Sequence, residues 1–168
     1  MKTYRFVLGI GGASIDNILA MYKVMKAYRK QTLYRFRIGS ANDEVLEQLD
    51  PKGLSFKERL RCLWLAHELG FETSVFIDPM MDNSPDAVVE AVKPYVTEAI
   101  WLGKAKSLKH FLTVYPGPNN KRRVAKADKL LKLQSAVNLK VIHKRLKRDP
   151  KVRWGKTIQK AIGLKRSK

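Results

Sequence analysis

The chain has 168 residues, of which 45% are hydrophobic, so it can form a domain with a real core and is not a disordered chain. Its single cysteine, Cys62, excludes a disulfide framework and an all-cysteine metal site within the chain. The net charge of +19 is uneven, because residues 1–102 hold 13 basic and 13 acidic residues whereas residues 103–168 hold 21 and 2. This division predicts a neutral domain at 1–103 and a basic helical extension at 104–168 that attracts polyanions.

The beginning of the chain predicts a strand followed by a helix. Residues 4–10 are typical of a strand, and Ser14 is a suitable N-cap for a helix over residues 15–30. The glycine-rich turn between them could hold phosphate at the helix start, but it lacks the lysine and hydroxyl pair of a P-loop, so a tight turn is favoured. The same glycines break the apolar start, which therefore does not resemble a signal peptide, and no apolar run approaches the length of a membrane span. We expect a cytoplasmic protein with no membrane partner.

The second predicted strand, residues 34–38, alternates apolar and basic side chains and ends at Gly39. A polar cluster, residues 40–44, follows at once. The next helix is predicted over residues 56–69, because Ser55 and Glu58 have the spacing of a capping box. Cys62 lies within this helix, where packing is a better interpretation than metal binding.

The third predicted strand, residues 73–77, is rich in β-branched and aromatic side chains and ends in a second polar cluster, residues 78–83. Ser84 and Pro85 predict the start of a helix that ends near Lys93. A short fourth strand is predicted at residues 99–102, and a third polar cluster, residues 103–106, follows it.

Alternation of strands and helices with short links predicts an α/β fold with parallel strands and right-handed crossovers. The three polar clusters all follow strands. Because the carboxyl ends of parallel strands meet at one rim, we expect the three clusters to lie together, where α/β proteins bind ligands. A solvated set of connections is the alternative interpretation.

The last part of the chain predicts helices over residues 106–114, 121–134, 137–147 and 154–162, with a loop at 115–120. Aromatic side chains among cations can stack nucleic-acid bases, so this basic tail predicts either a nucleic-acid surface or a solvated basic surface. The residues concerned are Tyr115, Lys121, Arg122, Arg123, Lys144, Arg145, Lys147, Arg148, Lys151, Arg153 and Trp154.

Several short motifs occur along the chain in a characteristic order and spacing. They are Phe36-Arg37-Ile38-Gly39-Ser40, Ser55 to Leu60, Gly70 to Val75, Asp78-Pro79-Met80, Asp86 to Val92, Ile100 to Ala105, and Asp149-Pro150-Lys151 with Trp154. Taken together, these motifs resemble the second half of radical SAM proteins, and most of all the subgroup related to spore photoproduct lyase. The resemblance covers roughly residues 15–168.

The resemblance implies a partial (β/α) barrel of about four parallel strands that contributes to binding S-adenosylmethionine. In the family a four-iron, four-sulfur cluster cleaves this cofactor to a radical. By resemblance, Ser40 contacts the cofactor, Arg59 meets its carboxylate, Pro79 lines the adenine side and Lys104 lies where the last strand ends. These assignments follow from the family alone.

The chain departs from the family in three places. It lacks the Cys-x-x-x-Cys-x-x-Cys motif whose three thiolates hold the cluster, so this chain does not ligate it. The family's first strands have no counterpart, and Asp78 stands where the subgroup tends to have glutamate. We therefore expect the C-terminal fragment of a radical SAM enzyme, inactive unless a missing N-terminal half joins it, whether as a split-gene product, a remnant or a truncated frame.

Two other functions are considered. The alternative function is that of a basic nucleic-acid-binding module, in which the basic extension at 104–168 binds the nucleic acid. A weaker one is a metal-free acid/base enzyme that uses Asp43, Asp78 or Asp82, for which no histidine stands beside the carboxylates in the sequence.

Overall fold

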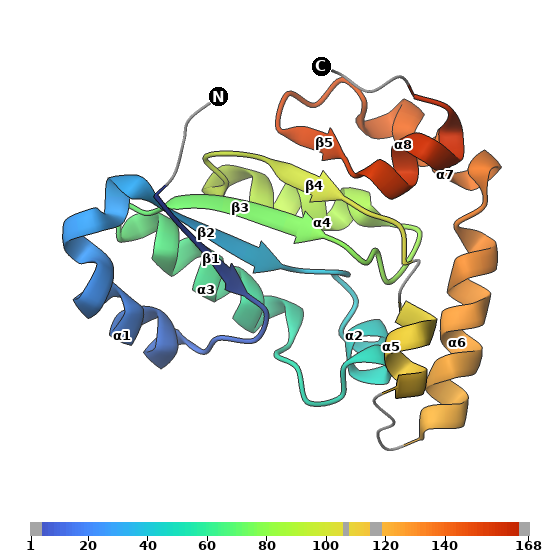
Figure 1. Ribbon diagram of the computed structural model, residues 1–168, viewed down its shortest axis with the longest axis horizontal. Helices are drawn as coiled ribbons and strands as arrows, with labels where there is room; N and C mark the ends of the chain where they lie inside the picture. Colours follow the sequence, from blue (N-terminus) through green and yellow to red (C-terminus); the bar gives the residue numbers. More distant parts are fainter. Residues whose placement is uncertain (1–4, 106–107, 115–118, 165–168) are drawn as a thin grey trace.

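The computed structural model describes residues 5–105, 108–114 and 119–164. Its five strands form one parallel sheet in sequence order (Figure 1). This order means that each crossover moves to the next strand in the same direction, as in a (β/α) barrel. The α/β class predicted from the sequence is confirmed. The strands are β1 (Phe6–Ile10), β2 (Thr32–Arg37), β3 (Glu72–Ile77), β4 (Ile100–Leu102) and β5 (Val152–Trp154).

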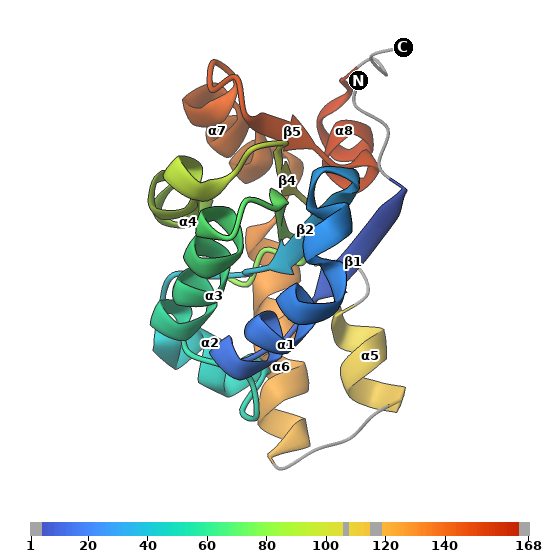
Figure 2. The same ribbon diagram turned by 90° about the vertical axis from the view of Figure 1, so that its left-hand side faces the viewer.

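Helices α1, α3 and α4 lie on one side of the sheet, whereas α5 and α6 lie beyond the carboxyl-terminal ends of the strands (Figures 1 and 2). Short 3-10 turns follow α1 and α4, at Lys26–Gln31 and Lys93–Tyr95. None of the helices in the described ranges is both long and apolar enough to span a bilayer. The helices are α1 (Ile15–Met25), α2 (Asp43–Leu49), α3 (Phe56–Glu68), α4 (Pro85–Val92), α5 (Leu108–Val114), α6 (Asn120–Leu133), α7 (Ala136–Leu146) and α8 (Lys156–Ile162).

The main core fills the space between the covered face of the sheet and the helices. Alternate strand residues such as Phe36, Val75 and Ile100 are buried there against helix residues such as Leu63 and Val89. A second, smaller core joins α2, α5 and α6, and thus attaches the basic helices to the rim of the sheet. Its buried members are Leu49, Ala105, Leu108, Leu112, Ala127 and Leu130.

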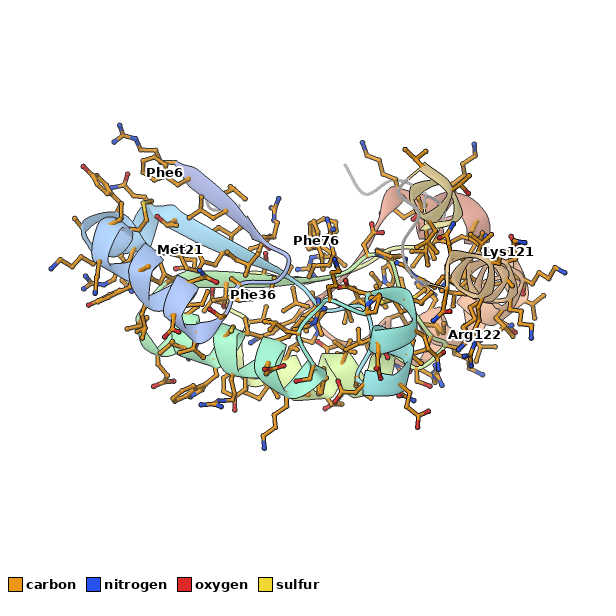
Figure 3. The ribbon with its side chains drawn as sticks, turned by 90° about the horizontal axis from the view of Figure 1, so that it is seen from below. Phe6, Met21, Phe36, Phe76, Lys121 and Arg122 are labelled. Carbon is orange, nitrogen blue, oxygen red and sulfur yellow. The ribbon has the colours of Figure 1, made fainter. Side chains whose placement is uncertain are left out.

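On the opposite face of the sheet, no helix of the described ranges covers the middle of the sheet around Phe76. Figure 3 shows Phe76 on this side of the sheet and the helices α1 to α4 on the other. In a closed (β/α) barrel this face would form the packed interior. The structure is therefore barrel-like but open, with an uncovered inner face.

Local signals predicted most helix starts correctly. The Ser14 side chain accepts the backbone N–H of Asn17, and Ser55 and Glu58 form the predicted capping box. Pro85 occupies the first turn of α4, as predicted, although the Ser84 side chain makes no capping hydrogen bond.

Two elements were not predicted. Helix α2 begins directly after Asn42, whose side chain accepts the backbone N–H groups of Glu44 and Val45. Strand β5 lies inside the segment expected to be helical, and pairs in parallel with β4. The helix predicted over residues 154–162 is therefore shorter, and begins at Lys156.

Candidate functional site

The three polar clusters meet at the carboxyl-terminal rim of the sheet, as expected from the sequence. Backbone hydrogen bonds join the loops, since Met81 donates to the Gly39 carbonyl at 2.9 Å and Met80 donates to the Gly103 carbonyl at 3.0 Å. The loops that follow β2, β3 and β4 are thus hydrogen-bonded to one another, and we call these three loops the rim.

Ser40, the first predicted cofactor contact, is fully buried within this rim. Its hydroxyl donates to the Asp82 carboxylate and accepts the backbone N–H of Asn42 at 2.9 Å. Asp82 also accepts the backbone N–H of Ser84 at 2.7 Å. Ser40 therefore joins the first two clusters, and its contact with a cofactor remains a prediction.

Asp78 is an exposed acidic residue of the rim, and its side chain lies across Gly103. A Cβ atom at Gly103 would lie 2.1 Å from Asp78 Cγ and 2.2 Å from its Oδ2, so only glycine leaves room for this carboxyl. Partial loss of water around the carboxyl raises its pKa above the usual range, and the positive charge of Arg37 opposes this. The carboxyl makes no hydrogen bond or ion pair with another described residue, so it is available to a ligand.

Pro79 and Lys104 also lie at the rim. The Asp78–Pro79 peptide bond is cis. The backbone N–H of Lys104 donates to the Thr157 hydroxyl at 3.0 Å, and its side chain lines a cavity shared with α6 and α8. This geometry tests neither predicted role. The positions of Pro79 and Lys104 agree with a site at the carboxyl-terminal ends of the strands.

Arg59 lies in the first part of α3, and its side chain is almost completely buried. Its guanidinium donates to the carbonyls of Leu54, Gly11 and Arg37, and to the Asp50 carboxylate at 2.9 Å. Four of its five N–H groups therefore have protein acceptors. The contact with a cofactor carboxylate remains a prediction, with a single donor left to make it.

The residues do not fit a four-iron, four-sulfur cluster. Three thiolates are required, and the chain has only Cys62. Its thiol is buried in α3, donates to the Ala13 carbonyl at 3.1 Å, and has a pKa that burial raises. No group of three or more potential metal-ligating side chains occurs in the described ranges.

No sequence pattern predicted the role of Gln134, whose buried side chain lies at the end of α6. Its amide nitrogen donates to the Met80 carbonyl at 2.9 Å and its amide oxygen accepts the Ala105 N–H at 2.8 Å. Gln134 therefore connects the rim loops to the basic helices.

The uncovered face carries a row of aromatic and basic side chains. Register places Arg37, Phe76, Trp101 and Arg153 side by side on β2 to β5. The Phe76 and Trp101 rings meet edge to face with centroids 6.1 Å apart, and the guanidinium of Arg35 lies 5.0 Å from the Phe76 ring centroid. We call these five residues the aromatic row.

Three polar atoms near this row are buried without a hydrogen-bond partner among the described residues: Arg35 Nε, Ser74 Oγ and Trp101 Nε1. Buried polar groups are normally hydrogen-bonded, so these three atoms make the aromatic row a candidate binding surface. The alternation of apolar and basic residues in β2 was visible in the sequence. The residues of β3, β4 and β5 that lie beside them on this face were not.

Some side chains of the basic tail have partners within the protein, and its nucleic-acid role remains a prediction. Trp154 packs on His143 with ring centroids 4.8 Å apart, and Tyr115 lies outside the described residues. Lys151 donates to two backbone carbonyls, and Arg145 pairs with Asp86 at 2.8 Å. Several tail cations therefore hold the fold together, whereas Lys121 and Arg122 point away from the body of the protein (Figure 3).

Comparison of the chain with protein-family models, with curated proteins and with solved structures found no match.

Proposed function

We propose that this chain is the cofactor-side half of a radical SAM barrel, which binds S-adenosylmethionine at its rim and depends on another segment for the iron–sulfur cluster. The sequential parallel sheet, the single helical layer and the uncovered inner face support this proposal. A barrel interior is normally filled by side chains from all its strands, so a sheet with one bare face leaves room for further strands.

The observation that carries the proposal is the free carboxylate of Asp78 at the meeting point of three strand ends. S-adenosylmethionine has cationic sulfonium and ammonium groups and ribose hydroxyl donors, all of which a carboxylate attracts. Arg37, the last residue of β2, and Lys104, in the loop after β4, offer cations for the cofactor carboxylate. These residues fit the cofactor chemically, whereas the residues for the cluster are missing.

In this proposal the chain's own residues bind and orient the cofactor, which supplies the adenosyl group. Asp78 holds a donor or cation of the cofactor, and the rim loops fix the position of this carboxylate through Gly103. The Ser40–Asp82 contact keeps the β2 and β3 loops together. The chain alone would bind the cofactor without cleaving it.

Equilibrium dialysis with radiolabelled S-adenosylmethionine tests this function. We expect the wild-type chain to bind, and Asp78→Asn to weaken binding by about tenfold, or about 1.4 kcal/mol, because the amide has no charge. Asp16→Asn, in the first turn of α1, is the matched control and should leave binding unchanged. Absence of binding, or equal binding by Asp78→Asn and wild type, would contradict the proposal.

A second candidate function, nucleic-acid binding, is favoured by the aromatic row. Base stacking on an aromatic side chain is worth about 1–3 kcal/mol, and the flanking guanidinium groups can contact phosphates. This candidate uses the uncovered sheet face, together with the general attraction of a +19 chain.

Fluorescence anisotropy with a labelled thymidine oligonucleotide tests the second candidate at two salt concentrations. We expect Trp101→Leu to weaken binding at both, and Trp64→Leu, which alters an exposed tryptophan of α3, to have little effect. Equal affinities of the two variants would show that any binding is general charge attraction.

A further inference from the structure

A cavity of about 630 Å³ lies beside the rim, between the end of β4, α6 and α8. We call it the lysine pocket. The C-terminal end of α6 and helix α8 lie at the same end of the molecule (Figure 1). Its lining residues are Lys104, Leu131, Lys156, Thr157, Lys160 and Ala161.

The charge of the lysine pocket has one sign. Three lysines line it and no carboxylate does. The ammonium groups of Lys104, Lys156 and Lys160 make no hydrogen bond or ion pair with another described residue. Because no carboxylate lines the cavity beside these three lysines, an anion placed there would be attracted by all three.

The hydroxyl of Thr157 adds a directed donor. Its oxygen accepts the backbone N–H of Lys104 at 3.0 Å, which leaves the hydroxyl proton free to donate to a ligand. Leu131 and Ala161 supply an apolar wall, together with the methylene stems of the lysines. The pocket thus combines a strongly cationic part with an apolar part.

A second cavity, of about 280 Å³ between α2 and α6, lacks these properties although it also contains cations. Glu47 lines it, Arg123 donates to the Leu49 carbonyl, and Lys126 is bonded to Gln48. Two of its three cations therefore already have protein partners, and its carboxylate would repel an anion.

We propose that the lysine pocket binds a phosphate monoester whose organic group is apolar or aromatic. A monoester carries up to two negative charges and three strong acceptor oxygens, which match three ammonium groups and one hydroxyl. The cavity volume falls within the range of small-molecule sites. This inference shares Lys104 with the proposed S-adenosylmethionine site and otherwise rests on different side chains, Lys156, Thr157 and Lys160 among them.

Isothermal titration with phenyl phosphate, inorganic phosphate and methyl phenyl phosphate tests the ligand class. We expect phenyl phosphate to bind several-fold more tightly than inorganic phosphate, because only the former uses the apolar wall. Methyl phenyl phosphate, a diester with one charge, should bind at least fivefold more weakly than phenyl phosphate. Preference for the diester would overturn the monoester assignment and indicate a nucleic-acid backbone instead.

Matched variants test the site. The double variant Lys156→Gln with Lys160→Gln should weaken phenyl phosphate binding at least tenfold. The control, Lys140→Gln with Lys144→Gln, removes the same charge from exposed positions of α7 and should change binding less than twofold. Equal losses in the two double variants would overturn the proposal, because they would reflect net charge alone.

Leu131→Gln provides a test that does not depend on the lysines. It should reduce the affinity for phenyl phosphate to that for inorganic phosphate while leaving the latter unchanged. Retention of the full preference for the phenyl group would contradict the assigned position of the ligand.

Discussion

Gly103→Ala tests the packing on which the rim depends. The added Cβ would lie 2.1 Å from Asp78 Cγ, 2.2 Å from Oδ2 and 2.7 Å from Cβ, all far below van der Waals contact. The Asp78 side chain must therefore leave its position, and part of the local backbone must shift. Overpacking of this kind costs about 1 to 3 kcal/mol in the free energy of unfolding.

Urea unfolding of four proteins measures this effect: wild type, Gly103→Ala, Asp78→Ala and the double variant. Asp78→Ala removes two of the three clashing atoms, so the double variant should be more stable than the sum of the single changes predicts, by about 1 kcal/mol. Gly103→Ala should also weaken S-adenosylmethionine binding, because the carboxylate moves.

Gly9→Ala is the control for a glycine-to-alanine change where the added methyl group has room. Gly9 lies within β1, whereas Gly103 directly follows β4, and an added Cβ at Gly9 would meet no atom within 4 Å. We expect this substitution to be neutral or slightly stabilising, because it reduces the conformational freedom of the unfolded chain. A Gly103→Ala protein as stable as Gly9→Ala would refute the argument that Asp78 lies across Gly103.

Other substitutions test the contacts that position the rim. Gln134→Met leaves the Met80 carbonyl and the Ala105 N–H buried without partners, so we expect a loss of about 2 to 4 kcal/mol in urea unfolding; a loss below 1 kcal/mol would contradict the proposed link. Ser55→Ala removes a capping box and should cost about 1 kcal/mol, whereas Ser84→Ala, whose side chain caps nothing, should stay within about 0.5 kcal/mol; equal costs would count against the assignment. Burial acts to raise the pKa of Asp149, but hydrogen bonds from Lys93 and from the Lys151 N–H outweigh it and lower the pKa. The carboxylate therefore stabilises the fold above the pKa of an unfolded aspartate, and this stabilisation is lost as the pH falls through the lower pKa of the folded state. Asp149→Asn should accordingly destabilise the protein by about 1 to 2 kcal/mol at neutral pH and by progressively less in acid, and a difference that is constant with pH would be the contrary result.

Much of the sheet could be predicted because its signals are local. Capping residues such as Ser55 and strand runs such as residues 73–77 determine their elements through neighbouring residues alone. The meeting of the three polar clusters also followed from the parallel order of the strands.

The missed features depend on contacts between distant segments. Strand β5 has only three residues, too few for a periodic pattern, and it exists because the free edge of β4 offers backbone partners: Ile100 donates to the Lys151 carbonyl at 2.8 Å. Likewise, the aromatic row requires the register of four strands, and no single stretch of sequence contains it.

The most direct test of the central claim is an NMR titration of the isotope-labelled chain with S-adenosylmethionine. If S-adenosylmethionine binds at the rim, we expect the amide chemical shifts to change there, above all at Gly39, Asp78 and Gly103. The amide shifts of α1 should be unaffected. Shift changes confined to α6, α7 and α8, or no changes at millimolar cofactor, about the weak limit of specific binding, would contradict the claim.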